Sequence, residues 1–548
     1  MKAARLATLV LALSTGCAST PNARPAPRPR RAPPAPLVVA IVLDQVGSWV
    51  LSHHLPLLSD DGLIKPMIAR GAWARDVRLT YAGTYTGPGH AAIYTGAPPA
   101  DSGVVANRVW DRERARMVSV VDDSAHEEFG NEARAHAAPT GLRVDTVADV
   151  LRREGARRAG VTRVAAISMK DRSAVIPGGQ RPDLALWYTE EARGFTTSRY
   201  YAPSMPGWLS AWNAAHPVSA YFGRAWEPYD VAALRATGMT DDQRGEGSWH
   251  GLGVTFPHLL SRCDEPYTAF LATPWSSEHL VAMAREVVSR LDMGGDAAPD
   301  LLMLSVSGPD YVGHVFGPES WESMDNLSRV DRMLGAFVRG LSARGPVSVL
   351  VTADHGVMPL IERAPAAERA ARIQFADVER VAEEALDAAL GQGDWVAAYV
   401  QPYVYLRPAA LAPARRERAV GVAASAIARL PGVASVERTS EAAGWRRDPN
   451  PTRRAAAESV DPRVAGELIV VPAEGSVVDE RMPEGFGTSH GSPYPRDQSI
   501  PLLVSGPGVP RADISGARDF RTVAATLAWL LDVTPPAAAR RAPAWEDR

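Results

Sequence analysis

The sequence predicts an α/β protein in which a mostly parallel central sheet carries helices on both faces, with lobes inserted into it. Three observations predict this fold. Short runs of Val, Ile and Leu recur without strict alternation, as strands covered on both faces require. Helical segments lie between these runs, which is the order that produces parallel strands. Two long stretches with a different rhythm interrupt the alternation and are expected to be the lobes.

The expected strands are six short apolar runs: residues 37–44, 163–169, 301–307, 347–354, 466–472 and 501–507. The expected helices that alternate with them cover residues 144–155, 277–293 and 323–345. The last helix has apolar residues at helical spacing and ends at a glycine. In such sheets, ligands bind beyond the carboxyl ends of the strands, so function is sought there.

The two predicted insertions cover residues from about 176 to 275 and from about 360 to 465. The first is aromatic and turn-rich and lacks the rhythm of parallel strands. Its tryptophans at 187, 208 and 212 either wall a binding site or pack within the lobe, and the sequence leaves both open. The second contains the helical pattern VERVAEEALDAAL and the strand pattern AYVQPYVYLRP.

The N-terminus resembles an export signal. Lys2 and Arg5 precede a short apolar stretch that cannot span a bilayer, and Cys17 follows a glycine as in a bacterial lipoprotein cleavage site. Residues 1–17 are therefore predicted to be a signal peptide of lipoprotein type, with plain cleavage as the alternative. The Pro/Arg-rich residues 18–36 are predicted to be an extended tether. We expect an exported bacterial protein, periplasmic or anchored to the outer membrane by lipid.

Composition excludes several classes of protein. The 548-residue chain has a net charge of −3, so no basic field predicts a nucleic-acid partner. If Cys17 is lipidated or removed, Cys263 has no partner, which excludes a disulfide framework and a zinc–thiolate site. After the signal, no run of about 20 apolar residues predicts a membrane span.

Acidic and imidazole side chains gather at or just past the predicted strand ends. A lone Asp after a strand is usually a turn former or a helix cap. Here six such residues recur, although the chain has only 12 histidines: Asp44, Asp310, His314, Asp354, His355 and His490. Carboxylate and imidazole ligands suit Zn²⁺, and six would serve two ions. Asp310 and His314 could meet at one ion if their segment is helical.

The stretch TYTGPGHAAIYTG, residues 84–96, reads as neither a clean strand nor a helix. Thr86 stands in it before a Gly-Pro-Gly run. One interpretation is a connecting turn; the other is a nucleophile held at a bend, with Gly87, Pro88 and Gly89 shaping the bend and admitting a substrate to the backbone. His90 is interpreted as structural.

Taken together, Asp44 and the motifs TGPGH, DYVGH, TADHG and TSHGSPY resemble the alkaline phosphatase superfamily. They are most similar to its bacterial zinc monoesterases with a threonine nucleophile, and the resemblance extends from residue 37 to about 510. It implies a catalytic domain that covers residues 37–548 and binds two Zn²⁺ ions. One zinc would be bound by Asp310, His314 and His490. The other would be bound by Asp44, Asp354, His355 and Thr86.

The resemblance also implies the reaction. Zinc would lower the pKa of the Thr86 hydroxyl, which would attack a phosphate monoester and form a phosphothreonine. Asn107, Lys170 and Arg172 would contact the phosphoryl oxygens, the last two on one face if their strand continues through them. A threonine at this place disfavours a sulfatase. The alternatives are a phosphodiesterase or nucleotide pyrophosphatase on the same scaffold, and a non-catalytic surface lipoprotein. The sequence does not show the substrate or the oligomeric state.

Overall fold

The computed structural model describes residues 33–131, 135–156, 160–363, 370–479, 486–540 and 542–546. The predicted signal peptide, with Cys17, and most of the predicted tether lie outside the described residues. Within the described part of the chain, no helix combines the length and apolarity needed to cross a membrane.

The central sheet confirms the predicted α/β class. It has ten strands in the order β19-β2-β18-β11-β1-β10-β5-β6-β7, and β20 pairs with β2. The five neighbours at its centre are parallel: β11 (Val347–Thr352), β1 (Leu37–Leu43), β10 (Asp300–Val306), β5 (Val164–Ser168) and β6 (Leu184–Thr189). The strands that flank this centre are β18 (Ser499–Ser505) and β7 (Gly194–Thr196), both antiparallel to their inner neighbours. The outer edge consists of β2 (Ala72–Arg78), β19 (Ala512–Ile514) and β20 (Arg518–Asp519).

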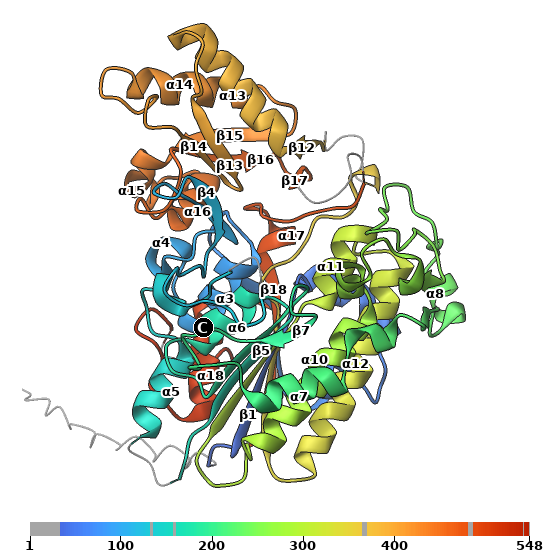
Figure 1. Ribbon diagram of the computed structural model, residues 1–548. Coiled ribbons are helices and arrows are strands. Elements are labelled where there is room, and N and C mark those ends of the chain that lie inside the picture. Colours follow the sequence, from blue (N-terminus) through green and yellow to red (C-terminus); the bar gives the residue numbers. More distant parts are fainter. Residues whose placement is uncertain are drawn as a thin grey trace, which may run out of the picture.

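Helices cover both faces of this sheet, as Figure 1 shows. All of β1 is buried, and its side chains alternate between two cores. Val39 and Ile41 face one core with α1 (Ser48–His54), α2 (Ile64–Arg70), α10 (Pro274–Arg290), α11 (Gly308–Phe316) and α12 (Trp321–Ser342). Val38 and Ala40 face the other core with α3 (Thr86–Thr95), α5 (Val147–Gly155) and α18 (Arg521–Leu531). Helix α6 (Asp171–Gly178) contacts α3, β5 and β6.

A first lobe lies between β7 and β10. Its elements are α7 (Gly207–Ala215), β8 (Ala225–Trp226), α8 (Val231–Ala236), β9 (His258–Leu259) and α9 (Pro266–Ala269). The range predicted as the first insertion, 176–275, also contains β6 and β7, which belong to the central sheet. The apolar run of β6 pairs with β5 in spite of its aromatic surroundings, so the inserted part begins after β7.

A second lobe has its own sheet and stands above the body in Figure 1. Its strands follow the order β13 (Val396–Val400), β14 (Tyr403–Leu406), β16 (Leu468–Pro472) and β15 (Val433–Arg438), all antiparallel. Helices α13 (Phe375–Leu390) and α14 (Arg416–Ile427) share a hydrophobic core with this sheet. The lobe also contains β12 (Arg372–Gln374), paired with β17 (Val477–Asp479), and α15 (Ala442–Trp445) and α16 (Pro451–Ser459).

The second lobe corrects one expectation. The apolar run 466–472 is a strand, but it lies in the lobe's antiparallel sheet and not in the central sheet. A fully buried run has the same sequence character in either sheet, so only its partners distinguish the two.

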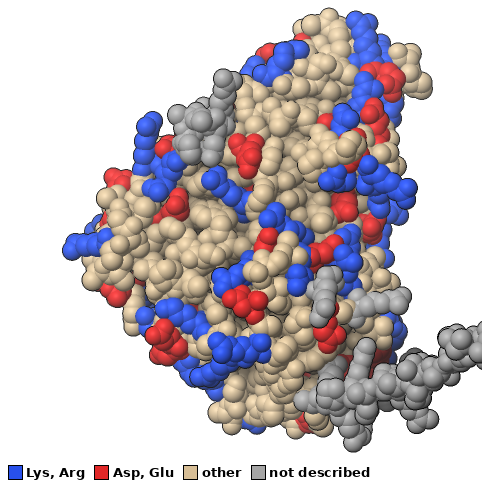
Figure 2. Space-filling model, turned by 180° about the vertical axis from the view of Figure 1, so that it is seen from behind, with Lys and Arg blue, Asp and Glu red and all other residues tan. Residues whose placement is uncertain are grey.

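Basic and acidic side chains are interspersed over the face seen in Figure 2. On that face no extended field of one sign is visible, in keeping with the net charge of −3. The charge pattern of this face therefore indicates no polyanion-binding surface.

Candidate active site

The six predicted metal ligands meet at the carboxyl ends of three neighbouring strands. Asp44 directly follows β1, Asp310 lies in the first turn of α11 after β10, and Asp354 comes two residues after β11. Because these strands are parallel and adjacent, their ends bring the side chains together. His314 lies one turn further along α11, and His490 comes from the loop before α17 (Pro495–Gln498). All six residues are buried.

The first group consists of Asp44, Asp354 and His355, whose ligand atoms lie within 4.8 Å of one another. The Nε2 atom of His355 is 3.5 Å from Asp44 Oδ1 and 3.5 Å from Asp354 Oδ2. The Nδ1 atom of His355 is 2.9 Å from the carbonyl oxygen of Gly356, an acceptor only, so Nδ1 carries the proton. Nε2 therefore keeps its lone pair, which faces two carboxylate oxygens.

The second group is the predicted set Asp310, His314 and His490; the ligand atoms that lie within 4.8 Å of one another around Asp310 are those of Asp310, His355 and His490. Asp310 Oδ1 is 3.3 Å from His314 Nε2 and 3.6 Å from His490 Nε2. The Nδ1 atoms of both histidines donate to backbone carbonyl oxygens at 2.8 Å, that of His314 to Thr488 and that of His490 to Thr84. These bonds fix the ring orientation and tautomer in the manner of metal-bound histidines. The two groups are contiguous, because the His355 and His490 rings stack with centroids 3.7 Å apart.

This arrangement fits divalent metal ions. Asp44 Oδ1 and Asp354 Oδ2 are buried and have no hydrogen-bond partner among the described residues. Both face a histidine lone pair, so three electron-rich atoms point at one another, which is unfavourable unless a cation lies among them. Carboxylate oxygen and imidazole nitrogen are ligands of the borderline-soft first-row metals.

Lys170 links the two groups. Its Nζ atom donates to Asp44 Oδ2 at 2.6 Å and to Asp310 Oδ2 at 2.6 Å, so it contacts one carboxylate of each group. Burial alone would lower the pKa of Lys170, but the two carboxylates outweigh burial and raise it above its ordinary value. Lys170 is therefore a buried ammonium at the centre of the site.

The pKa values of the surrounding groups follow from burial and neighbouring charge. Burial, with the Asp310 and Asp354 carboxylates, raises the pKa of Asp44 well above its ordinary value. Burial acts on Asp310 too, but Lys170 and His314 hold its pKa well below the ordinary value. Burial lowers the pKa of both His355 and His490, so these rings stay neutral. Ionised carboxylate and neutral imidazole are the forms that bind metals.

Thr86 stands at the edge of the first group, with Oγ1 3.5 Å from His355 Nε2. The structure corrects the predicted bend, because Thr86 is the first residue of α3. Pro88 lies in the first turn, where its missing N–H interrupts no helix bond. A Cβ atom on Gly89 would lie 2.3 Å from the carbonyl oxygen of Asp354. Gly89 therefore lets the helix approach the Asp354 loop.

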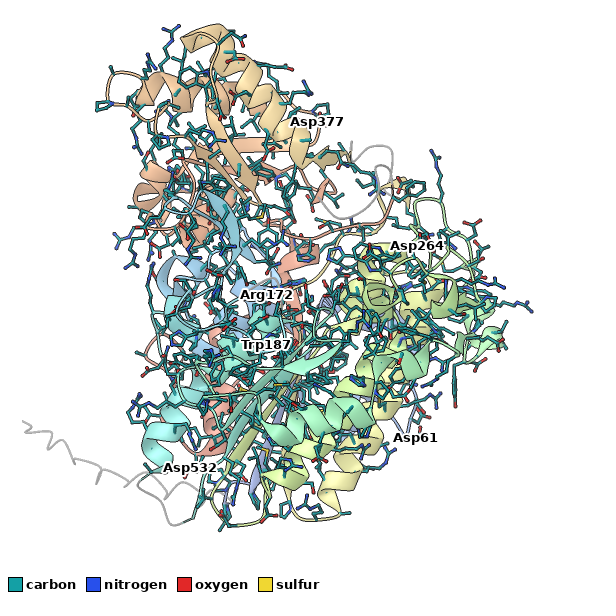
Figure 3. The ribbon with its side chains drawn as sticks, in the orientation of Figure 1. Asp61, Arg172, Trp187, Asp264, Asp377 and Asp532 are labelled. Carbon is teal, nitrogen blue, oxygen red and sulfur yellow. The ribbon has the colours of Figure 1, made fainter. Side chains whose placement is uncertain are left out.

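Asn107, Lys170 and Arg172 line one cavity of about 430 Å³. Asn107 Oδ1 accepts from the Gly87 N–H at 2.8 Å, which places Asn107 beside Thr86. Lys170 and Arg172 were expected to share one face of a strand if the strand continued through them. It does not continue, because β5 ends at Ser168 and α6 begins at Asp171. Arg172 Nη1 lies 3.4 Å from Asp171 Oδ1. Figure 3 shows Arg172 and Trp187 near each other, and both line this cavity.

A narrower cavity of about 80 Å³ lies next to Thr86 and the second group. It is lined by Thr86, Asn107, Asp310, His314 and His490 from the body, and by Phe375 and Val400 from the second lobe. The site therefore opens at the junction of the body and this lobe.

Gln45 is a contributing residue that the sequence did not reveal, and His90, interpreted as structural, contacts Thr86 directly. Gln45 has a positive φ of 71°. Its backbone N–H donates to Asp354 Oδ1 at 3.2 Å, and its Nε2 donates to Asp310 Oδ1 at 2.8 Å. Its only sequence signal is its place directly after Asp44. His90 donates from Nδ1 to the Thr86 carbonyl oxygen at 2.8 Å and pairs through Nε2 with Ser305 Oγ at 2.9 Å. His90 lies one helical turn after Thr86, a spacing that could have revealed it.

Comparison with known proteins adds independent information. The sequence matches the family described as Type I phosphodiesterase / nucleotide pyrophosphatase over residues 38–493. The alkaline phosphatase PafA of Elizabethkingia meningoseptica is 26% identical over 97% of this chain and 96% of its own. The alkaline phosphatase PhoV of Synechococcus elongatus is 30% identical over 58% of each chain.

Solved structures of PafA share the fold. Wild-type PafA superposes with a TM-score of 0.83 at 24% identity, over 94% of this chain and 99% of that chain. A PafA variant with a threonine, an asparagine, a lysine and an arginine substituted gives a TM-score of 0.84 at 25% identity.

Proposed function

The chain belongs to the Type I phosphodiesterase / nucleotide pyrophosphatase family, and from that premise we propose that it is a zinc-dependent alkaline phosphatase. In this proposal it hydrolyses phosphate monoesters through a covalent phosphothreonine at Thr86 and releases inorganic phosphate. The observation that carries the proposal is the position of the Thr86 hydroxyl, 3.5 Å from the His355 nitrogen that faces Asp44 and Asp354.

Two Zn²⁺ ions suit the donor set, which contains only nitrogen and oxygen ligands. Asp44, Asp354 and His355 would hold one ion next to Thr86. Asp310, His314 and His490 would hold the other. When bound, zinc supplies Lewis acidity, which lowers the pKa of a coordinated hydroxyl and stabilises charge on phosphoryl oxygens.

The chain's own residues then carry out two displacements. The Thr86 oxygen attacks phosphorus, so that the Oγ–P bond forms and the P–O bond to the leaving group breaks. Water next attacks the phosphothreonine, which restores the Thr86 hydroxyl and releases phosphate. Lys170, buried between Asp44 and Asp310, remains a fixed positive charge beside the reacting group. Thr86 begins α3, so the positive end of the helix dipole favours the phosphoryl group there.

Three side chains favour a monoester over a diester. A monoester dianion carries an additional charged oxygen, so it gains more from cations and N–H donors directed at it. Asn107, Lys170 and Arg172 line one cavity next to the metal ligands. The four residue types substituted in the PafA variant, in chain order, are those of Thr86, Asn107, Lys170 and Arg172.

The rival function is a phosphodiesterase, which is also the activity in the family's description. The test compares kcat/KM for p-nitrophenyl phosphate and bis-p-nitrophenyl phosphate with zinc-loaded enzyme. We expect the monoester to be hydrolysed at least about 10²-fold faster, the order that one well-placed charge stabilisation supplies. A higher kcat/KM for the diester would assign the chain to the rival.

A non-catalytic surface lipoprotein is the second alternative. Full metal occupancy without turnover of either ester would support it. We further propose that the chain is exported and anchored through Cys17, because Lys2, Arg5 and the short apolar stretch precede that cysteine. Labelled palmitate should be incorporated by the wild-type protein and not by Cys17→Ala; equal labelling would refute the anchor.

A further inference from the structure

A side cavity of about 260 Å³ adjoins the ligands of the second metal group. We define it by Glu190, Trp249 and Tyr311, with Arg172 and His314 at its inner end. It shares Arg172, Glu190 and Tyr311 with the larger cavity that contains Asn107 and Lys170. A substrate whose phosphoryl group lies between Arg172 and His314 would therefore extend its other end toward Glu190 and Trp249.

One carboxylate, that of Glu190, lines the side cavity. Glu190 is half-buried and accepts a hydrogen bond from the Thr268 hydroxyl. Burial raises the pKa of Glu190, the Thr268 hydrogen bond opposes that rise, and the Glu191 carboxylate adds to it. His250 and Glu265 also face Glu190, with opposite effects. A partly desolvated carboxylate with carboxylate neighbours is stabilised by a cation.

The same cavity offers aromatic surfaces. Trp249 is half-buried, and its indole nitrogen has no hydrogen-bond partner among the described residues. The Tyr311 ring is also half-buried, and its centroid lies 5.1 Å from Lys170 Nζ, so the cavity begins next to the phosphoryl-binding side. Aromatic faces combined with a carboxylate recognise alkylammonium groups through cation–π attraction and charge.

Two arginines also line the side cavity, and their positive charges oppose the negative charge of Glu190. Arg172 lies 3.4 Å from Asp171 and, under the proposed function, contacts the phosphoryl group. Arg108 is exposed and borders all three cavities, so it lies at their common rim. Deeper in the larger cavity, Glu128 is buried and bonded to Trp187 Nε1 at 2.8 Å, and Glu191 adds another carboxylate. Away from Lys170 and Arg172, three acidic side chains therefore line the larger cavity, Glu128, Glu190 and Glu191, and of these Glu190 also lines the side cavity.

From this geometry we propose that the preferred substrate is a phosphate monoester whose leaving group carries an alkylammonium, such as the phosphate ester of an amino alcohol. The inference rests on the proposed monoesterase function. Hydrolysis consumes one water and yields the amino alcohol and inorganic phosphate. The volume of about 260 Å³ suits a small leaving group, since it lies below the range of drug-sized pockets, which begins at about 300 Å³.

A matched pair of substrates tests the inference. Phosphocholine and 3,3-dimethylbutyl phosphate have leaving groups of nearly the same shape, and only the first carries a positive charge. We expect kcat/KM to be about 10-fold higher for phosphocholine, the order of a cation–π contact reinforced by a carboxylate. Phosphoglycolate, whose leaving group carries a carboxylate, should be hydrolysed more slowly than the neutral ester. Equal rates for the matched pair, or a preference for phosphoglycolate, would overturn the inference.

Variants connect the preference to the side cavity. Glu190→Gln and Trp249→Leu should each bring the ratio of the two kcat/KM values toward one, whereas damage to the fold would slow both substrates alike. Glu278→Gln is the control, because Glu278 is exposed, pairs with Arg224 at 3.1 Å and lines neither cavity. An unchanged ratio in both cavity variants would refute the site. Turnover of neither ester by zinc-loaded wild type would instead refute the monoesterase function, and this inference with it.

Discussion

Two buried regions bring histidine and carboxylate side chains together, and only the one at the strand ends has the character of a metal site. Where the first lobe meets α12, His258 Nε2 of β9 lies 3.0 Å from Glu322 Oε1 of α12, and both side chains are buried. His258 Nδ1 is bonded to the Leu252 carbonyl oxygen, so Nε2 carries a lone pair. Burial raises the pKa of Glu322 well above its ordinary value and lowers that of His258 to about 4. The protonated Glu322 therefore donates to a neutral His258.

At the strand ends, the same pair of residue types is arranged differently. Burial raises the pKa of Asp310, but Lys170 holds it well below its ordinary value, so no carboxyl proton lies between Asp310 and His314. The comparison teaches that burying acids and imidazoles does not by itself make a metal site. A fixed positive charge that keeps Asp310 ionised, together with histidines whose lone pairs point inward, distinguishes the two regions.

The largest expected effect is the loss of activity when Thr86 is replaced. Thr86→Ala removes the nucleophile, and we expect kcat for p-nitrophenyl phosphate to fall on the order of 10⁴-fold. Thr86→Ser keeps a hydroxyl and should retain far more activity. Steady-state kinetics of the zinc-loaded variants provide the measurement, and similar rates for the Ala and Ser variants would exclude Thr86 as nucleophile.

Lys170→Met makes the strand-end region more like the His258–Glu322 pair, because Asp44 and Asp310 lose the positive charge that they share. We expect kcat to fall by about 10²- to 10³-fold, as when one preorganised charge stabilisation is removed. Lys65→Met is the control, since Lys65 pairs at 3.2 Å with the exposed Asp60. If both lysine variants kept full activity, Lys170 would not be what distinguishes the two regions.

Gly89→Ala tests how closely α3 must approach the metal-binding loops. The added Cβ atom would meet the Asp354 carbonyl oxygen at 2.3 Å, so the helix must shift. We expect a loss of about 1–3 kcal/mol in the free energy of unfolding, and a lower kcat. In the control, Gly207→Ala, the new atom meets nothing within 4 Å. The control should have the unfolding free energy and the kcat of the wild type, measured by chemical denaturation and steady-state kinetics. An equal loss in both variants would contradict the packing argument.

The prediction with the smallest expected effect on activity concerns a buried acid of the first lobe, Glu246. Burial, with Glu322 adding, raises the pKa of Glu246 to about 9 from an ordinary 4.5. The folded state then binds the proton more tightly than the unfolded state, so this group's contribution to stability is lost as pH rises from about 4.5 to about 9. Glu246→Gln does not titrate, so its stability relative to wild type should increase over that range. A difference in unfolding free energy that does not depend on pH would refute the assignment.

The sequence indicated that Asp44, Asp310 and Asp354 lie together because each stands at or just past a buried apolar run, and parallel strands bring such ends together. The sequence did not predict α3, because glycine and proline disfavour a helix locally. The helix is explained by the contact of Gly89 with the Asp354 loop. The ion pairs of Lys170 join β1, β5 and α11, which no local pattern reveals. No local pattern around Glu190, which follows β6, places it in one cavity with Trp249 and Tyr311, because these come from distant segments.

The most direct test of the difference between the two buried regions is the metal content of the purified protein after zinc loading and dialysis, measured by mass spectrometry. We expect two zinc ions per chain in wild type and in Glu322→Gln, which keeps a donor to His258. Asp354→Asn and His490→Ala should each retain about one, because each removes a ligand of one group. Wild-type protein without bound zinc, or strand-end variants that keep both ions, would contradict the account.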